Sequence, residues 1–153
     1  MDHVLNKTYL HQFLQQNLLG VLSTVTSDNI PDAAPIYFIP HASFEIYFIT
    51  AASTQKVKNI NHANDVVLTI MNKDLTETVR VCGKAEITDN DATKSLGELA
   101  RSLQYKENFL EALPVLKYKG QKKLVVKIVP TEIRIRQYTE YSFVEKKFDF
   151  TSQ

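Results

Sequence analysis

Apolar and polar residues follow two different periods along this chain, and these periods predict both helices and strands. Residues 8–18 place apolar side chains three to four positions apart and are followed by Gly20, which is typical of an amphipathic helix and its C-terminal end. Residues 54–62 repeat the pattern over a shorter length, and residues 89–103 repeat it over a longer one. The sequence therefore predicts three helices.

Alternating and continuous apolar runs predict the strands between these helices. The segments with strand character are 21–25, 34–39, 44–49, 66–71, 78–87, 124–129 and 132–138. Pro130 stands at the expected bend between the last two. Short polar turns join the first three strands into an antiparallel meander. Six or seven antiparallel strands with one crossover helix are expected to close into a small barrel, so the fold class is α+β, mainly β, with flanking helices.

The composition is that of one ordinary domain. The chain has 153 residues, of which 44% are hydrophobic, so residues 1–153 are interpreted as a single domain with its own core. The formal net charge of +1 argues against a general nucleic-acid binder. Residues 106–153 nevertheless carry ten basic and six acidic side chains. This excess is interpreted either as a solvated basic face or as cations that help to hold an anionic ligand.

The sequence does not indicate a secreted or membrane protein. Cys82 is the only cysteine, so no internal disulfide is expected, and its strand-like surroundings favour a small buried hydrophobe. No apolar run approaches the roughly 20 residues of a membrane-spanning helix, and MDHVLNKTYL lacks the layout of a signal peptide. We therefore expect a soluble cytoplasmic protein without a membrane partner.

The stretch TAASTQK, residues 50–56, combines hydroxyl groups with a lysine at a strand-to-helix junction. Backbone N–H groups and the positive end of a helix dipole favour a phosphate at such a position. Thr50, Ser53 and Thr54 supply hydroxyl donors, and Lys56 supplies a full charge. The alternative interpretation is structural, with Ser53 or Thr54 as the helix N-cap and Lys56 as a solvated side chain. On the first interpretation, the ligand is a phosphorylated cofactor.

Several segments, in this order, carry a resemblance to a known family. They are AAPIYF at residues 33–38, YFITAASTQKVKNI at residues 47–60 and VRVCGKAEITD at residues 79–89. Together they resemble the pyridoxamine 5′-phosphate oxidase-like superfamily of flavin-binding split barrels. Weaker agreement continues to VKIVPTEIRIRQY at residues 126–138. The resemblance implies a split β-barrel homodimer with FMN lying across the subunit interface.

The resemblance also implies which residues hold FMN. Those that fall at the phosphate and ribityl end are Thr50, Thr54, Gln55 and Lys56. Those that fall where strand backbone lies along the flavin ring are Ala34, Pro35, Ile36 and Tyr37. Thr78 falls where a side chain of the neighbouring subunit reaches the flavin. Backbone donors beside the ring would stabilise the charge of the reduced flavin.

Two departures separate this chain from the members of the family that oxidise B6 compounds. Those members carry an arginine and a lysine in the second strand, where this chain has Ala34 and uncharged neighbours, and an arginine at the position of Gln55. They also end in a segment with tryptophan and arginine that closes over the substrate, whereas this chain has no tryptophan and ends in YSFVEKKFDFTSQ. Oxidation of pyridoxamine phosphate is therefore not expected, and the smaller number of cations predicts weaker FMN binding.

No catalytic side chain is predicted. The four histidines lack the spacing of a zinc site, so no metal is expected. Asp28 and Asp32 lie in a predicted turn, where aspartate commonly bonds to local backbone. The sequence contains neither a nucleophile elbow nor a Gly-rich phosphate loop.

The expected function is that of a flavin-dependent oxidoreductase that acts on a small organic substrate. Hydride would pass between the substrate and the flavin ring, while the protein supplies position and polarity. One alternative is a flavin-storing or flavin-sensing protein without turnover. Another is a member of the same fold that binds a deazaflavin or heme. The sequence leaves these alternatives open because a fold indicates the cofactor more firmly than the reaction.

Overall fold

The computed structural model describes residues 4–88 and 120–151. The bounds of the elements, in chain order, are α1 Lys7–Gln16, β1 Leu19–Val25, β2 Pro31–Pro40, β3 Ile46–Ala51, α2 Gln55–His62, β4 Asp65–Met71, β5 Glu77–Ile87, β6 Lys123–Tyr138 and β7 Phe143–Asp149. The first two predicted helices are confirmed as α1 and α2. The third, at residues 89–103, lies outside the described residues.

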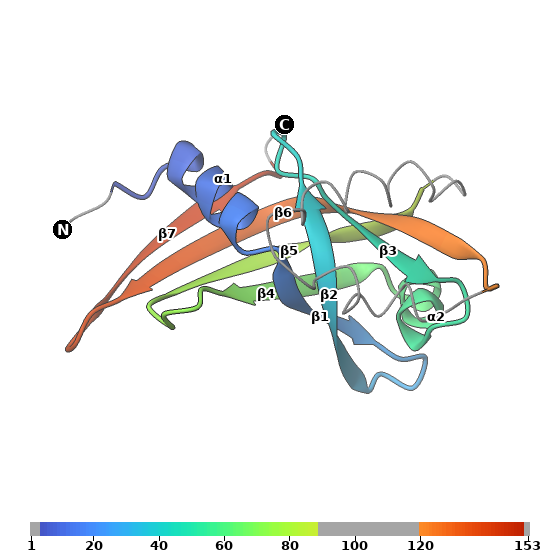
Figure 1. The fold of residues 1–153 in the computed structure, drawn as a ribbon. Coiled ribbons are helices and arrows are strands. Elements are labelled where there is room, and N and C mark those ends of the chain that lie inside the picture. Colours follow the sequence, from blue (N-terminus) through green and yellow to red (C-terminus); the bar gives the residue numbers. More distant parts are fainter. Residues whose placement is uncertain (1–3, 89–119, 152–153) are drawn as a thin grey trace.

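Six of the strands close into an antiparallel barrel, and the seventh extends its sheet (Figure 1). Neighbouring strands follow the order β3-β2-β1-β4-β5-β6, and β6 returns to pair with β3. β7 pairs with the C-terminal part of β6. The predicted α+β, mainly β barrel is confirmed. Among the described residues, neither helix has the length and apolar character that crossing a membrane requires.

The barrel is split between β2 and β3. β2 pairs with β1 over residues 31–37. Its pairing with β3 begins only at Phe38↔Phe48 and ends at Pro40↔Ile46. Among the described strands, residues 31–36 of β2 therefore have a neighbour on one side only.

β6 is one long strand, where the sequence predicted two strands that meet at Pro130. A β-bulge replaces the predicted break, because the pairing with β5 shifts register between Cys82 and Gly83, beside Pro130. Proline has no N–H to donate, and a bulge accommodates that absence without ending the strand. The hydroxyl of Thr131 also donates to the carbonyl of Cys82 at 3.1 Å, which stabilises the bulge.

β7 is a strand that the sequence did not predict. Phe148 is its only buried residue, and the other positions are exposed. The alternation that marks a half-buried strand is therefore missing from its sequence. Antiparallel pairing with residues 132–138 of β6 makes this segment a strand.

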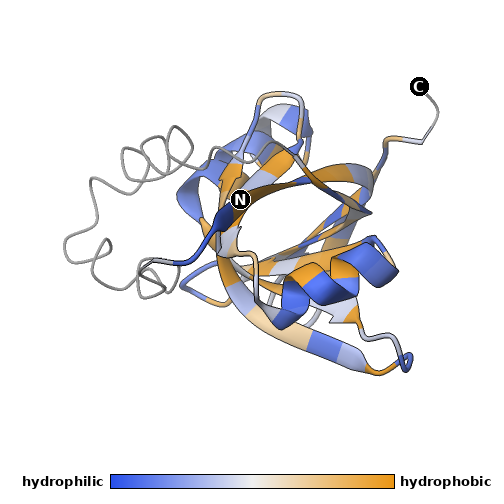
Figure 2. Ribbon diagram, turned by 90° about the vertical axis from the view of Figure 1, so that its right-hand side faces the viewer, coloured by the Kyte–Doolittle hydropathy of each residue, from blue (hydrophilic) through white to orange (hydrophobic). Residues whose placement is uncertain are grey.

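The interior of the barrel is the hydrophobic core. Val79, Val81 and Ala85 of β5 are buried, while the charged residues between them are exposed, as the alternation predicted. Figure 2 shows hydrophobic and hydrophilic residues alternating along the strands that curve around this interior. α1 adds Leu10 and Leu14, both fully buried, to the same core. This packing holds β2, β3 and α2 in fixed positions around the split.

Candidate functional site

The junction of β3 and α2 places two threonine hydroxyls side by side. Thr50 is buried at the end of β3, and Thr54 holds the N-cap position of α2. Their Oγ1 atoms lie 3.1 Å apart, and Thr54 Oγ1 donates to the carbonyl of Ala51 at 3.0 Å. The hydroxyl of Thr54 is therefore directed back toward β3.

The helix α2 begins without a side-chain cap. A capping hydroxyl normally accepts a hydrogen bond from the second or third N–H of the helix, and Thr54 makes no such bond. Ser53 does not replace it, because its hydroxyl donates to Gln121 Oε1 at 2.6 Å. The N-terminal N–H groups and the positive end of the dipole are therefore left uncapped by these side chains. This arrangement is the one that binds phosphate at helix N-termini.

Lys56 places a half-buried cation on the first turn of α2, whereas Lys58 on the same helix is exposed. Burial lowers the pKa of the Lys56 ammonium group, and the carboxylate of Asp32 opposes this shift only in part. The ion pairs of the described residues do not include Lys56. A charge that is partly withdrawn from water without an ion-pair partner would be stabilised by an anionic ligand.

The buried side chain of Asn59 connects α2 to β1 and β2. Its Nδ2 donates to Thr24 Oγ1 at 2.9 Å and to Asp32 Oδ2 at 3.1 Å. Its Oδ1 accepts from Gln55 Nε2 at 2.7 Å, so the Gln55 amide is directed along the helix. Asp32, which was predicted in a turn, lies in β2, and that turn assignment is wrong. This amide network fixes the start of α2, with Lys56, beside the N-terminal half of β2.

Backbone groups of β2 point outward at the split. Phe38 N donates to the carbonyl of Leu18 at 2.9 Å, which marks these two as a hydrogen-bonded pair. Hydrogen-bonded and non-bonded pairs alternate along an antiparallel ladder, so every second residue of β2, counted from Phe38, bonds to β1. Ala34 is one of these residues, whereas the backbone groups of Ala33 and Pro35 point away from β1. A planar ligand at the split would therefore meet polar backbone groups.

The four residues predicted to contact the flavin ring differ in how far their side chains are buried. Ile36 is buried in the core, Ala34 and Tyr37 are half-buried, and Pro35 is exposed. Ile36 pairs with Gly20 in the same hydrogen-bonded phase as Ala34, so neither its side chain nor its backbone groups face the split.

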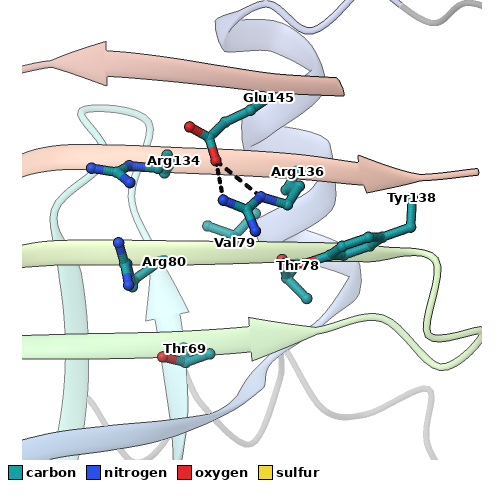
Figure 3. A pocket seen from close by; sticks show the side chains of 8 residues that line it. All are labelled: Thr69, Thr78, Val79, Arg80, Arg134, Arg136, Tyr138 and Glu145. Atoms are coloured by element: carbon teal, nitrogen blue, oxygen red, sulfur yellow. Dashed lines mark hydrogen bonds and ion pairs between the residues drawn. The ribbon is translucent and has the colours of Figure 1, made fainter. Parts of the chain in front are cut away.

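Thr78 lies in a separate hollow on the outer face of β4 to β7 (Figure 3). The hollow has a volume of about 280 Å³, and its lining residues are Thr69, Thr78, Val79, Arg80, Arg134, Arg136, Tyr138 and Glu145. Thr78 Oγ1 lies 3.4 Å from the hydroxyl oxygen of Tyr138. Hydrogen bonds with Thr78 and Arg136 lower the pKa of the Tyr138 hydroxyl. The hollow thus combines hydroxyl groups with guanidinium groups.

The start of α2 and Thr78 lie toward opposite ends of β6 (Figure 1). Thr50 pairs with Leu124, near the beginning of β6. Thr78 pairs with Arg136, near its end. At about 3.3 Å per residue, the intervening part of β6 is roughly 40 Å long. A small ligand that contacts both regions would therefore have to lie between two copies of the chain.

The structure brings most of the predicted cofactor residues into one region. Thr50, Thr54 and Lys56 gather at the start of α2. The amide network joins this group to β2, which carries residues 34–37. Thr78 lies apart from them, in the hollow.

The sequence-based prediction missed Asn59 and the arginines of the hollow. Arg134 and Arg136 alternate on one face of a predicted strand, which was a usable signal. Their proximity to Arg80 depends on the register of β5 against β6, which spacing along the chain does not give.

The sequence and the fold are similar to those of one known family. The model of the family described as pyridoxamine 5′-phosphate oxidase matches residues 7–137. No curated protein matches the sequence.

Solved structures with a similar fold carry names that point to different ligands. A pyridoxamine 5′-phosphate oxidase-related, FMN-binding protein from Nostoc punctiforme PCC 73102 is 11% identical, with a TM-score of 0.59 over 97% of this chain and 100% of that chain. An F420 reductase is 19% identical, with a TM-score of 0.66 over 80% and 94%. A heme-binding protein from Mycobacterium smegmatis is 16% identical, with a TM-score of 0.64 over 95% and 59%. At these identities the likeness establishes the fold alone.

Proposed function

Because the chain belongs to the pyridoxamine 5′-phosphate oxidase family, we propose that it is an FMN-binding flavoprotein that works as an oxidoreductase on a small organic substrate. The observation that carries this proposal is the half-buried Lys56 beside the uncapped start of α2. FMN, when bound, supplies the redox chemistry. The residues of the chain bind and orient it.

In this proposal, the start of α2 holds the phosphate group. Lys56 neutralises part of its charge, the first N–H groups of the helix donate to its oxygens, and the hydroxyls of Thr50 and Thr54 provide further donors. A bound anion also favours the charged form of Lys56, whose pKa is lowered by burial. Phosphate binding therefore offsets an electrostatic cost that the ligand-free protein carries.

The flavin ring is proposed to lie along the split edge of β2. Backbone groups of Ala33 and Pro35 point outward there, and residues 33–37 carry no charged side chain. The ring would receive backbone contacts rather than ionic ones. Such contacts orient the ring and set the polarity around it.

The functional form is proposed to be a homodimer with the flavin at the subunit interface. Thr78 and Lys56 can reach one flavin only from two subunits, given the length of β6 between their regions. The outer sheet face near Thr78 also exposes Leu19, Val21 and Met71, which a second copy would cover.

Because the only cysteine, Cys82, is unpaired, we further propose a cytoplasmic location.

The test is a titration of the purified protein with FMN and with riboflavin, followed by flavin fluorescence. Saturable binding that prefers FMN is expected. Lys56→Ala should weaken FMN binding by about 1.5–3 kcal/mol, the worth of a charge-assisted hydrogen bond, and leave riboflavin binding nearly unchanged. Lys58→Ala, on the exposed side of the same helix, is the matched control and should change neither affinity. An equal loss of affinity for FMN and for riboflavin in Lys56→Ala would contradict the assignment of Lys56 to the phosphate site.

Two other cofactors and a role without turnover are the competing proposals. The F420 reductase and the heme-binding protein share the fold, so F420 and hemin belong in the same titration. A Soret band would favour heme, and tighter binding of F420 than of FMN would favour the deazaflavin. Tight FMN binding without oxidation of NAD(P)H in the presence of an acceptor would favour a flavin sensor or store.

A further inference from the structure

The hollow that contains Thr78, here called the arginine hollow, is positively charged. Its lining includes three arginines and a single carboxylate. Arg136 pairs with that carboxylate, Glu145, at 2.6 Å. Arg134 pairs at 2.8 Å with Glu132, which also pairs with a lysine of β7. Among the described residues, Arg80 has no ion pair. The hollow therefore holds more cationic than anionic charge.

The pairing of β5 with β6 brings two of these cations together. Arg80 stands directly opposite Arg134 in the ladder. Figure 3 shows their guanidinium groups on one side of the hollow and that of Arg136 between β5 and β6. Like charges at directly opposite positions destabilise a sheet. An anion bound between these groups would remove the repulsion.

Hydroxyl groups complete the lining of the arginine hollow. Thr69, Thr78 and Tyr138 each place a hydroxyl on the same outer face. Guanidinium groups bind carboxylate and phosphate oxygens in a forked geometry, and hydroxyls add single donors. A volume of about 280 Å³ suits a small molecule, or the charged end of one.

We propose that the arginine hollow binds the oxyanion group, carboxylate or phosphate, of a small organic anion, and that this anion is the substrate. The second part rests on the proposed flavin function, because Thr78 belongs both to the hollow and to the predicted flavin contacts. Arg80 provides the unpaired cation for the anion. Arg136 and Arg134 contribute the donors that their own carboxylates leave unused.

A nucleic acid is a different class of anion, and the surface around the hollow does not favour it. Binding along a phosphate backbone requires a run of cations on one face. Here Glu86, Glu132 and Glu145 lie among the cations of β5 to β7. The concave site and the interspersed acids favour a small anion.

The experiment is isothermal calorimetry with three probes that share one ring: benzoate, phenyl phosphate and the neutral benzamide. Protein with and without added FMN is titrated, and saturable binding of benzoate, phenyl phosphate or both is expected, with none for benzamide. The tighter of the two anions identifies the preferred group. No saturable anion binding below about 10 mM would overturn the proposal. Tighter binding of a single-stranded oligonucleotide than of either probe would also overturn it.

A pair of variants on the outer face of β5 localises the binding. Arg80→Gln should weaken anion binding about tenfold or more, because it removes a charge-assisted hydrogen bond, while FMN affinity is unchanged. Lys84→Gln is the matched control and should leave anion affinity unchanged, since its ammonium group pairs with Asp65 at 2.5 Å. Equal weakening by both variants would show a diffuse charge effect and overturn the site.

The two proposals can fail separately. Anion binding by a protein that does not bind FMN would reject the flavin function and support the arginine hollow. FMN binding without anion binding would reject the arginine hollow alone.

Discussion

Lys56 and Arg80 share one chemical situation, because each is a cation in a position that costs stability. Burial lowers the pKa of Lys56, and a like charge stands directly opposite Arg80. Among the described residues, neither side chain belongs to an ion pair. Asp32 attracts Lys56 and Glu145 attracts Arg80 without forming an ion pair, so a bound anion would add to an incomplete compensation at both positions.

Removal of the Lys56 charge should therefore stabilise the ligand-free protein. Lys56→Met keeps most of the apolar stem and removes the desolvated ammonium group, so we expect the Tm at pH 7 to rise by about a degree or two. The folded pKa of Lys56 lies below the ordinary value of 10.5, so the unfolded chain binds more protons between these two values. The free energy of unfolding of the unmodified protein should therefore increase relative to that of Lys56→Met as the pH rises toward 10.5. Thermal unfolding from pH 7 to pH 10.5 tests this, and a lower Tm for Lys56→Met at pH 7 would contradict it.

At the scale of elements, the apolar periodicity of the sequence predicted which face of a single strand or helix is buried. The alternation along β5 gave the buried face of that strand, because each buried residue faces the barrel core. The apolar spacing of α1 likewise predicted Leu10 and Leu14 as core residues. In each case the pattern reflects burial of one face of a single element.

Pairing between distant segments accounts for what the sequence did not predict. β6 remains continuous through Pro130 because it accommodates one extra residue, Thr131, in a bulge opposite Cys82 and Gly83 of β5. β7 contributes one buried side chain, Phe148, and its other contacts depend on β6. The arginine hollow depends on the same register, which places Arg80 opposite Arg134.

Gly83 provides a test of the bulge at the scale of the element. A Cβ atom added there would lie 2.4 Å from the carbonyl oxygen of Val129 and 3.0 Å from the Cα of Pro130. Both neighbours are backbone atoms that cannot rotate away, so Gly83→Ala should lower the free energy of unfolding by about 1–3 kcal/mol. Urea unfolding measures the change. Lys84→Ala, exposed on the next residue, should stay within about 0.5 kcal/mol, and equal stability of the two variants would refute the steric account of the bulge.

For the whole molecule, the long strand β6 separates two chemically distinct regions. The start of α2 carries the proposed phosphate site beside the split, and the outer face of β4 to β7 carries the arginine hollow. A flavin that contacts both regions, as we propose, would have to lie between two subunits. If the flavin lies between subunits, its binding and dimerisation are thermodynamically linked, and each strengthens the other.

A charge on the exposed apolar face near Thr78 tests this linkage. Met71 is 51% exposed and pairs with Thr78 across β4 and β5, so Met71→Glu would bury a carboxylate in the proposed interface. We expect this variant to sediment as a monomer and to lose FMN binding, although Lys56 and α2 are unchanged. Leu75→Glu is the control, because Leu75 is 69% exposed in the turn beyond β4 and should leave both properties intact. If Met71→Glu remains dimeric, Val21→Glu on the neighbouring strand repeats the test. A monomer that binds FMN as tightly as the unmodified protein would show that one subunit holds the whole flavin site, and the proposed shared interface would be wrong.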